Sequence, residues 1–262
     1  MLEVSGIRGG YGDITVLWDI DVSVRTGCVT AILGRNGAGK TSLLDAISGV
    51  LSSIDAGSVT LNGDKISAWS TPRRIKGGLA YVQENKQIFR QRTVEENLLI
   101  GGFLLKGRTL RSAQRRAALE RAYDQFPILA ERRKFPAGGL SGGQQQMLAI
   151  AQALMPNPKL LMLDEPSAGL APAIATEVFE LVGRLRSSEL SILLVEQVVE
   201  EALAIADDVV VLESGRVAVS GTIDEFSDSA VVREIYLGST SGPDGASAEH
   251  EYQSNKKLEM ET

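Results

Sequence analysis

A glycine-rich segment carries the first pattern that could do chemistry. The stretch GRNGAGKTS, at positions 34–42, matches G-x-x-x-x-G-K-[ST] and follows an apolar run that is typical of a buried strand. Glycines let successive backbone N–H groups turn inward around phosphate oxygens, and a following helix adds the positive end of its dipole. The alternative is a glycine-rich turn without a ligand. Phosphate contacts are predicted at Gly34, Asn36, Gly37, Ala38, Gly39, Lys40, Thr41 and Ser42.

An acidic pair follows a second apolar run, LLMLDEP at positions 160–166. In a nucleotide site Lys40 reaches the β and γ phosphates and Thr41 ligates Mg²⁺. Asp164 at the strand end is placed to hold the same Mg²⁺, directly or through water, and Glu165 could accept a proton from an attacking water. A helix-capping turn is the alternative for this pair. The upstream phosphate loop favours the functional interpretation.

A third segment, LSGGQ at positions 140–144, predicts a helix start that can face an anion. Ser141 and Gln144 have the spacing of a capping box, and Gly142 and Gly143 leave backbone N–H groups free. By itself a capping box says only that a helix begins.

Composition limits the classes of chemistry. The chain has 262 residues, 44% of them hydrophobic, which allows a sizeable core. Its net charge of -6 argues against a nucleic-acid binder. Cys28 is the only cysteine and His250 the only histidine, which excludes an intramolecular disulfide, a Ser-His-Asp triad and histidine-bound zinc. No signal pattern or membrane-spanning run is found, so a soluble chain is expected, reaching a membrane only through partner subunits.

Three apolar runs must position these polar residues. They are VTAIL (29–33), LLML (160–163) and ILLV (192–195), and each predicts a buried parallel strand. Helical patterns follow each run, so the main layer is predicted to be doubly wound. Ligand chemistry in such sheets lies at the carboxyl ends of the strands, and the third run ends on Glu196 and Gln197.

Other segments predict antiparallel strands. VLWDIDVSV, at positions 16–24, alternates apolar and polar residues as a half-buried strand does. Asn62-Gly63 between two short strand patterns predicts a hairpin with a two-residue turn, and Ser214-Gly215 predicts a second hairpin. The first part of the chain is therefore predicted to be partly antiparallel.

A helical stretch is predicted between the first two apolar runs. Thr93 and Glu96 form a capping-box pattern at its start. Arginines surround one apolar face and are interpreted as its solvated side, with a partner-binding patch as the alternative. That apolar face consists of Ala118, Leu119, Ala122, Tyr123 and Phe126. Residues 239–262 are polar and small, which predicts a disordered tail.

The order of these motifs resembles that of the ATP-binding subunits of ABC transporters, from Leu2 to about Leu237. LSGGQ between the phosphate loop and LLMLDEP is the signature of that family. The resemblance implies an α/β fold: a P-loop NTPase (RecA-like) core with an antiparallel β subdomain and an inserted α-helical signature subdomain at about 90–156. It predicts an ATPase domain at residues 1–238, followed by the tail at 239–262.

The resemblance implies ATP and Mg²⁺ as ligands. Ser141, Gly142, Gly143 and Gln144 then face the γ-phosphate of ATP held by an opposite subunit, so neither site is complete in a monomer. Tyr11 matches the aromatic residue that stacks on adenine, with a loop tyrosine as the alternative. The implied metal ligands are Thr41, Gln83 and Asp164, and the implied catalytic residues are Glu165, Gln197 and Gln83.

Two positions depart from the family pattern. Gln197 stands where most of these ATPases have a histidine, and His250 in the tail cannot replace it. An amide can donate a hydrogen bond to a phosphate but never becomes positively charged. Ala171 stands where many relatives have an aspartate, which puts a loop contact across the dimer in doubt.

A narrower resemblance rests on TVEENLLIGGF, GGQQQMLAIAQALM, EPSAGLAP, LLVEQ and YLGS. Together they resemble the second ATPase subunit of branched-chain amino-acid importers, although importers of urea or short amides look much alike. The implied partners are two different permease subunits, a sister ATPase subunit forming a heterodimer, and an external solute-binding protein. The permease coupling helix is expected on the stretch 84–98, and the implied location is the cytoplasmic face of the cell membrane.

Two further alternatives remain open from the sequence. One is a regulatory subunit that binds ATP and barely hydrolyses it, motivated by Gln197 and Ala171. The other is an ABC-type ATPase of DNA repair or translation. Those proteins generally carry long coiled-coil inserts or a second ATPase domain, and this chain has neither.

Overall fold

The computed structural model describes residues 1–104 and 113–227. The chain divides into two compact units, Met1–Gly221 and Thr222–Thr262. The predicted domain end at residue 238 and the predicted tail at 239–262 lie outside the described residues. In the second unit, Thr222 and Glu225 exchange hydrogen bonds at the start of α9 (Ile223–Ser227).

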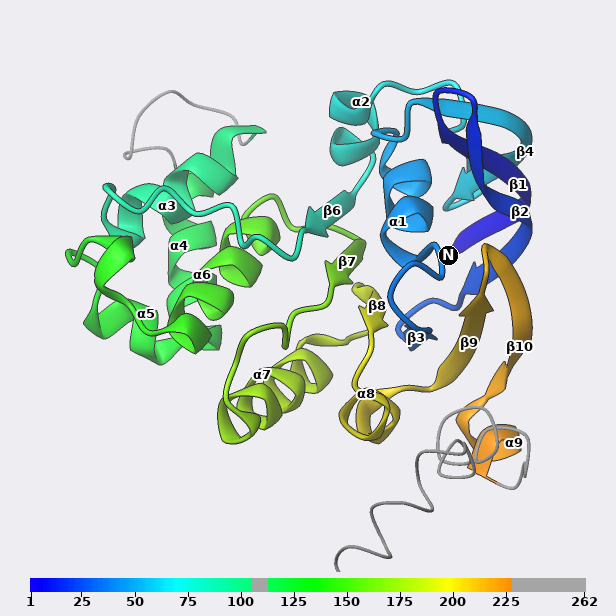
Figure 1. Ribbon diagram of the computed structural model, residues 1–262. Coiled ribbons are helices and arrows are strands. Elements are labelled where there is room, and N and C mark those ends of the chain that lie inside the picture. Colours follow the sequence, from blue (N-terminus) through cyan, green and yellow to red (C-terminus); the bar gives the residue numbers. More distant parts are fainter. Residues whose placement is uncertain (105–112, 228–262) are drawn as a thin grey trace, which may run out of the picture. The chain divides into compact units, whose positions relative to one another are not determined.

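The first unit contains the sheets and most of the helices (Figure 1). Its strands are β1 (Leu2–Tyr11), β2 (Ile14–Val24), β3 (Val29–Leu33), β4 (Ser53–Leu61), β5 (Asp64–Lys65), β6 (Leu79–Val82), β7 (Leu160–Asp164), β8 (Ser191–Glu196), β9 (Asp208–Glu213) and β10 (Arg216–Thr222), whose last residue opens the second unit. Its helices are α1 (Lys40–Ser48), α2 (Thr71–Lys76), α3 (Val94–Gly101), η1 (Gly102–Leu104), α4 (Ala113–Gln125), α5 (Pro127–Glu131), η2 (Ala137–Gly139), α6 (Gly142–Leu154), α7 (Pro172–Leu185) and α8 (Val199–Ile205).

The larger sheet has the strand order β10-β9-β3-β8-β7-β6. Pairing is parallel from β6 through β7, β8 and β3 to β9, which confirms the three predicted parallel strands. Because β3, β7 and β8 run in one direction, the phosphate loop, Asp164 and Glu196 come to the same edge of the sheet.

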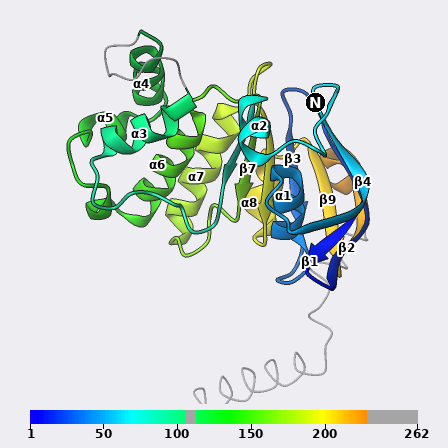
Figure 2. The ribbon, with the colours of Figure 1, turned by 90° about the horizontal axis from the view of Figure 1, so that it is seen from above.

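Helices cover both faces of this sheet. Alternate residues of β8 separate the faces: Leu193 and Val195 belong to a core cluster that includes Leu43 and Ile47 of α1. Ile192 and the other intervening residues of β8 are equally buried, and the pleat turns them to the opposite face. Figures 1 and 2 show α1 between the two sheets, and Figure 1 shows α7 and α8 on the other side. The doubly wound prediction is confirmed.

The smaller sheet is antiparallel, with the strand order β2-β1-β4-β5. Leu61 pairs with Asp64 across the predicted two-residue turn, where Asn62 and Gly63 have φ of 53° and 85°. Positive φ at both turn residues is the geometry that Asn-Gly favours, so this hairpin prediction is confirmed. Ser214 and Gly215 also have positive φ, of 50° and 75°, between β9 and β10.

Helices α3 to α6 lie between β6 and β7 in the chain, and both views show them gathered away from the antiparallel sheet. The predicted capping box of Thr93 and Glu96 is present at the start of α3. Ala118, Ala122 and Phe126 are buried, as the predicted apolar face of α4 requires. The boundaries of about 90–156 for an inserted subdomain stay a prediction.

A buried arginine closes the far end of α1. Arg74 of α2 is 2% exposed, and burial lowers the pKa of its guanidinium. Its Nη1 donates to the carbonyls of Ala46 and Ile47, at 2.8 and 2.6 Å, in the last turn of α1. Its other nitrogens donate to Ser67 and Trp69 carbonyls. A cation on the last carbonyls of α1 also complements the negative end of the helix dipole.

We expect Arg74→Met to lower the free energy of unfolding by about 1–3 kcal/mol, because buried carbonyls at the end of α1 lose the hydrogen bonds that Arg74 donates. The measurement is urea unfolding of the full chain. Arg73→Met is the matched control on the same helix, since Arg73 is exposed and stacks on Trp69 at 4.3 Å. Its loss should stay below about 1 kcal/mol. Equal losses for the two variants would contradict the capping role.

Candidate functional site

The predicted phosphate loop joins β3 directly to α1. Gly39 precedes the first helical residue with φ of 102°, a conformation that side chains disfavour. A Cβ on Gly34 would lie 2.6 Å from the Leu212 carbonyl oxygen, so the loop needs glycine there for close packing. Asn36 and Gly37 are exposed, whereas Ala38 and Ser42 are buried.

Lys40 is held inside this loop. Its side chain is 4% exposed, and its Nζ donates to the Gly34 and Arg35 carbonyls at 2.8 and 3.3 Å. The same Nζ lies 3.0 Å from Glu165 Oε1. The structure therefore brings the predicted phosphate-binding cation and the predicted base into one ion pair. A phosphate bound at Lys40 must compete with Glu165 for the ammonium group.

Asp164 ends β7 with 3% of its surface exposed. Thr41 Oγ1 donates to its Oδ1 at 3.2 Å, and the Tyr81 hydroxyl donates to its Oδ2 at 3.1 Å. Burial raises the pKa of Asp164, while the hydrogen bonds from Tyr81 and Thr41 act in the opposite direction. The predicted pair of Thr41 and Asp164 is thus in direct contact.

Two residues of this network were missed from the sequence. The Tyr81 hydroxyl lies between Asp164 and Asp45, 3.5 Å from Asp45 Oδ1, and the Tyr11 hydroxyl donates to Asp45 Oδ2 at 2.9 Å. Burial, followed by the two carboxylates, raises the pKa of Tyr81. Signals existed: Asp45 is one helical turn after Thr41, and Tyr81 lies two residues before Gln83, which was predicted to contact the metal. Tyr11 is thereby hydrogen-bonded to α1, and the residue remains 44% exposed.

Glu165 has a backbone conformation that needs external support. Its φ is 44°, in the left-handed region, and its N–H donates to the Val195 carbonyl at 2.9 Å. The neighbouring strand β8 therefore fixes where this carboxylate starts. A carboxylate facing a loop lysine, with a buried Asp164 beside it, can accept a proton from water once the lysine binds another anion.

Glu196 supplies a second contact from β8 to the same loop. It is 1% exposed; its Oε1 accepts from the Ser167 N–H at 3.0 Å, and its Oε2 accepts from the Gln197 N–H at 3.1 Å. Burial raises the pKa of Glu196, and hydrogen bonds from Ser167 and Gln197 oppose that effect. Gln197 itself is exposed beyond the strand. The polar strand end was noticed in the sequence, but only Gln197 received a role.

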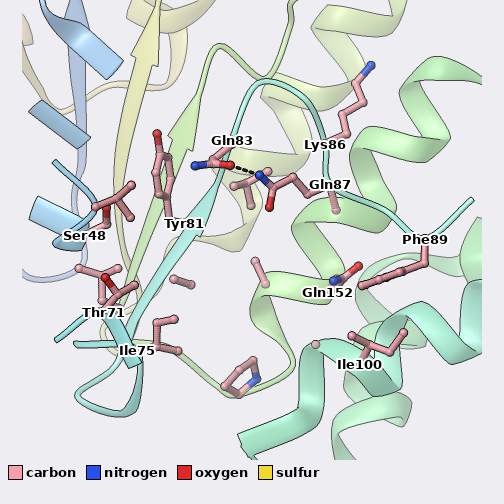
Figure 3. A pocket seen from close by; sticks show the side chains of 18 residues that line it. Ser48, Thr71, Ile75, Tyr81, Gln83, Lys86, Gln87, Phe89, Ile100 and Gln152 are labelled. Atoms are coloured by element: carbon pink, nitrogen blue, oxygen red, sulfur yellow. Dashed lines mark hydrogen bonds between the residues drawn. The ribbon is translucent and has the colours of Figure 1, made fainter. Parts of the chain in front are cut away.

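Gln83 directly follows the last residue of β6. The Gln87 amide donates to its side-chain oxygen, and both residues line a pocket of about 470 Å³ (Figure 3). Val50, Phe89 and Ile100, all partly exposed, also line this pocket. A direct contact of Gln83 with a metal stays a prediction.

The signature segment lies apart from the phosphate loop. Ser141 accepts from the Gln144 N–H, and Gln144 accepts from the Ser141 N–H, so the predicted capping box opens α6. Gly143 packs closely on α7, because a Cβ there would lie 2.2 Å from Ile174 Cγ2. Figure 1 places α6 among the helices, with β6 and β7 between it and α1, and Figure 2 also shows β7 between α6 and α1. The structure therefore does not bring Ser141 through Gln144 to Lys40.

The donor set fits a magnesium ion that is shared with a phosphate. Within residues 1–104 and 113–227, no cluster of three or more His, Cys, Asp or Glu side chains could hold a metal alone. Mg²⁺ differs from other metals in that it commonly keeps several waters and uses one or two carboxylates together with substrate phosphates. The hydroxyl of Thr41 beside the carboxylate of Asp164 meets that requirement.

We expect Tyr81→Phe to cost about 1.5–3 kcal/mol of unfolding free energy at neutral pH, because Asp164 loses a donor to its charged form. Since the pKa of Asp164 is raised, its ionisation opposes folding as the pH rises through that pKa, and the Tyr81 bond offsets part of this cost. The deficit should therefore shrink as the pH falls and Asp164 becomes protonated. Urea unfolding in metal-free buffer measures it.

The control for this prediction is Tyr123→Phe. The Tyr123 hydroxyl donates to the carboxylate of the half-buried Glu95 at 3.0 Å, and this variant removes that hydroxyl. A smaller loss is expected there because solvent can replace the donor. A Tyr81→Phe deficit that does not change with pH would count against a bond to ionised Asp164.

The sequence matches the ABC transporter family over residues 17–168. It is 38% identical to the high-affinity branched-chain amino acid transport ATP-binding protein BraG of Pseudomonas aeruginosa, over 91% of this chain and 100% of that protein. It is 39% identical to the probable branched-chain amino acid transport ATP-binding protein LivF of Archaeoglobus fulgidus, over 91% of this chain and 99% of the relative.

The fold is similar to that of a nucleotide-free ATP-binding cassette from an ABC transporter, with a TM-score of 0.77 and 30% identity, covering 90% of this chain and 98% of the other. This likeness confirms the predicted P-loop NTPase fold. Among the helices of the described residues, none has the length and apolarity needed to cross a membrane. The chain therefore belongs to the ABC transporter family, as an ATP-binding subunit.

Proposed function

We propose that this chain hydrolyses ATP to drive the import of branched-chain amino acids. The observation that carries this proposal is the pair of relatives named for that transport, each aligned over 91% of the chain. The site supports it, because Lys40 lies 3.0 Å from Glu165 and Thr41 donates to Asp164 at 3.2 Å, and these two pairs lie at the same edge of the sheet.

In the proposed reaction, the loop and Lys40 bind the ATP phosphates. The phosphate takes the place of Glu165 at the Lys40 ammonium, which frees the carboxylate. Glu165 then accepts a proton from the water that attacks the γ-phosphorus, while the bond from that phosphorus to the β,γ-bridging oxygen breaks and ADP leaves. Gln197 can donate its amide N–H to the γ-phosphate. Thr41 and Asp164 would hold Mg²⁺, which when bound neutralises charge on the β and γ phosphates. Tyr81 keeps Asp164 oriented.

A second ATPase subunit is proposed to complete each site. The separation of the Ser141–Gln144 segment from Lys40 supports this, because Ser141 and Gly142 at the start of α6 are exposed and could meet a phosphate carried by another subunit. A sister subunit would make the pair a heterodimer. In the nucleotide site, Tyr11 is proposed to stack on adenine. The loss of a polar side chain at Ala171 removes one possible contact between the two subunits.

The remaining partners are proposed to be two different permeases and an external solute-binding protein. The pocket beside Gln83 supports a permease contact, because Val50, Phe89 and Ile100 present apolar surface there (Figure 3). In this proposal the chain lies at the cytoplasmic face of the cell membrane, bound through its partners.

We expect Glu165→Gln to reduce ATP hydrolysis by at least about 100-fold while ATP binding persists, because the amide cannot accept the proton of water. The measurement is steady-state hydrolysis by the complex purified through a tag on this chain. Glu177→Gln on the exposed side of α7 is the matched control and should retain the wild-type rate. Hydrolysis that is indifferent to Glu165→Gln would favour a regulatory subunit.

The transported solute is tested in the same variants. In a strain that lacks this chain, the wild type should restore uptake of labelled leucine, isoleucine and valine, and Glu165→Gln should not. Restored urea uptake without amino-acid uptake would replace the proposed substrate with urea or short amides. Unchanged uptake of every solute would contradict a role in import.

We expect Lys40→Ala to weaken ATP binding by about tenfold to a hundredfold, since charge-assisted hydrogen bonds contribute about 1.5–3 kcal/mol. Titration calorimetry with ATP measures the change. Lys65→Ala, on the exposed strand β5, removes an equal charge outside the site and should leave the affinity unchanged. If both variants bind ATP like the wild type, the phosphate-loop assignment is wrong.

A further inference from the structure

Glu196 is an unusual residue to bury at the end of an apolar strand. The other side chains of β8 after Ser191 are Ile192, Leu193, Leu194 and Val195, all fully buried. Glu196 is 1% exposed, and its carboxylate accepts from two backbone N–H groups. Burying a carboxylate is costly even with such donors, so stability alone gives no reason for a charged residue here.

Its two acceptor bonds lead to both sides of the proposed reaction. Oε1 binds the Ser167 N–H, two residues after Glu165, at 3.0 Å. Oε2 binds the Gln197 N–H at 3.1 Å, which fixes the backbone from which the Gln197 amide projects. One side chain therefore contacts the loop of the proposed base and the residue proposed to touch the γ-phosphate.

The loop after β7 needs this support because Glu165 has φ of 44°. A non-glycine residue in the left-handed region is retained only where its surroundings hold it. The Val195 carbonyl accepts from the Glu165 N–H, and the Glu196 carboxylate accepts from the Ser167 N–H. Two adjacent residues of β8 therefore hold the loop on either side of Pro166.

We infer that Glu196 is a positioning residue for ATP hydrolysis: its buried carboxylate holds the Glu165–Ser167 loop and Gln197 in the arrangement that hydrolysis requires. This inference rests on the proposed function, because it assigns Glu196 an effect exerted through Glu165 and Gln197. A carboxylate suits the task since both of its oxygens accept hydrogen bonds, whereas a glutamine at this position offers only one acceptor oxygen.

The test compares Glu196→Gln and Glu196→Ala in the full-length chain, purified with its partner subunits. We expect Glu196→Ala to lower kcat for ATP by about tenfold to a hundredfold, as small displacements of catalytic groups do, with KM within about twofold of the wild type. Glu196→Gln keeps one of the two hydrogen bonds, so its kcat should lie between those of the wild type and Glu196→Ala. Hydrogen exchange should accelerate in peptides covering Ser167 and Gln197, with the rest of the sheet unchanged.

Thr30→Val is the matched control in the neighbouring strand β3. Thr30 is fully buried, and within the described part of the chain its hydroxyl has no hydrogen-bond partner. It should keep the wild-type kcat. If both Glu196 variants keep the wild-type kcat, the positioning role is overturned. It is equally overturned if kcat, ATP affinity and thermal stability fall together, since that pattern reports general unfolding.

A Glu165→Gln arm separates the two proposals. If Glu165→Gln hydrolyses ATP like the wild type, the proposed function fails, and the inference about Glu196 fails with it. If Glu165→Gln abolishes hydrolysis while the Glu196 variants are unaffected, only the positioning role is wrong.

Discussion

The parallel pairing of β3, β7 and β8 decides where each charged group of the site can lie. Val29 to Leu33 pair with Ile192 to Glu196, and Leu160 to Asp164 pair with Ser191 to Val195, without a register shift. The phosphate loop, the Asp164–Glu165 pair and Glu196 are far apart in the chain, yet this register places them at one edge. A slip by one residue would turn Asp164 or Glu196 to the opposite face of the sheet.

Several charges in this protein are buried, and each has polar partners around it. Lys40 has two loop carbonyls and Glu165, Asp164 has two hydroxyl donors, and Glu196 has two backbone N–H groups. At the opposite end of α1, Arg74 donates to four backbone carbonyls, two of which belong to the last turn of α1. The phosphate-loop helix is thus held by charged groups at both of its ends, and apolar packing holds its sides.

The signature segment lies apart from Lys40, with β6 and β7 between α6 and α1. The capping box satisfies part of the α6 helix start, where Ser141 and Gly142 are exposed and Gly143 is buried against α7. An exposed helix start can face an anion. Family membership and this geometry together favour a second subunit as the source of that anion. Gln197 departs from the family pattern in that its side chain cannot carry a charge. The Glu196 carboxylate accepts from the Gln197 N–H and thereby holds the Gln197 backbone in place.

Local patterns in the sequence determined much of this protein: the three parallel strands β3, β7 and β8, the hairpin at Asn62-Gly63, the capping boxes at Thr93 and Ser141, the glycine-rich loop between β3 and α1, and Asp164 and Glu165 at the end of β7. Each depends on residues close together in the chain, so periodicity, turn chemistry and spacing identify it. The ion pair of Lys40 with Glu165, the Tyr81 bridge between Asp45 and Asp164, and the Glu196 grip on Ser167 were decided only by the tertiary structure. Those contacts join segments between 29 and 125 residues apart, and only strand order and register bring such segments within hydrogen-bonding distance.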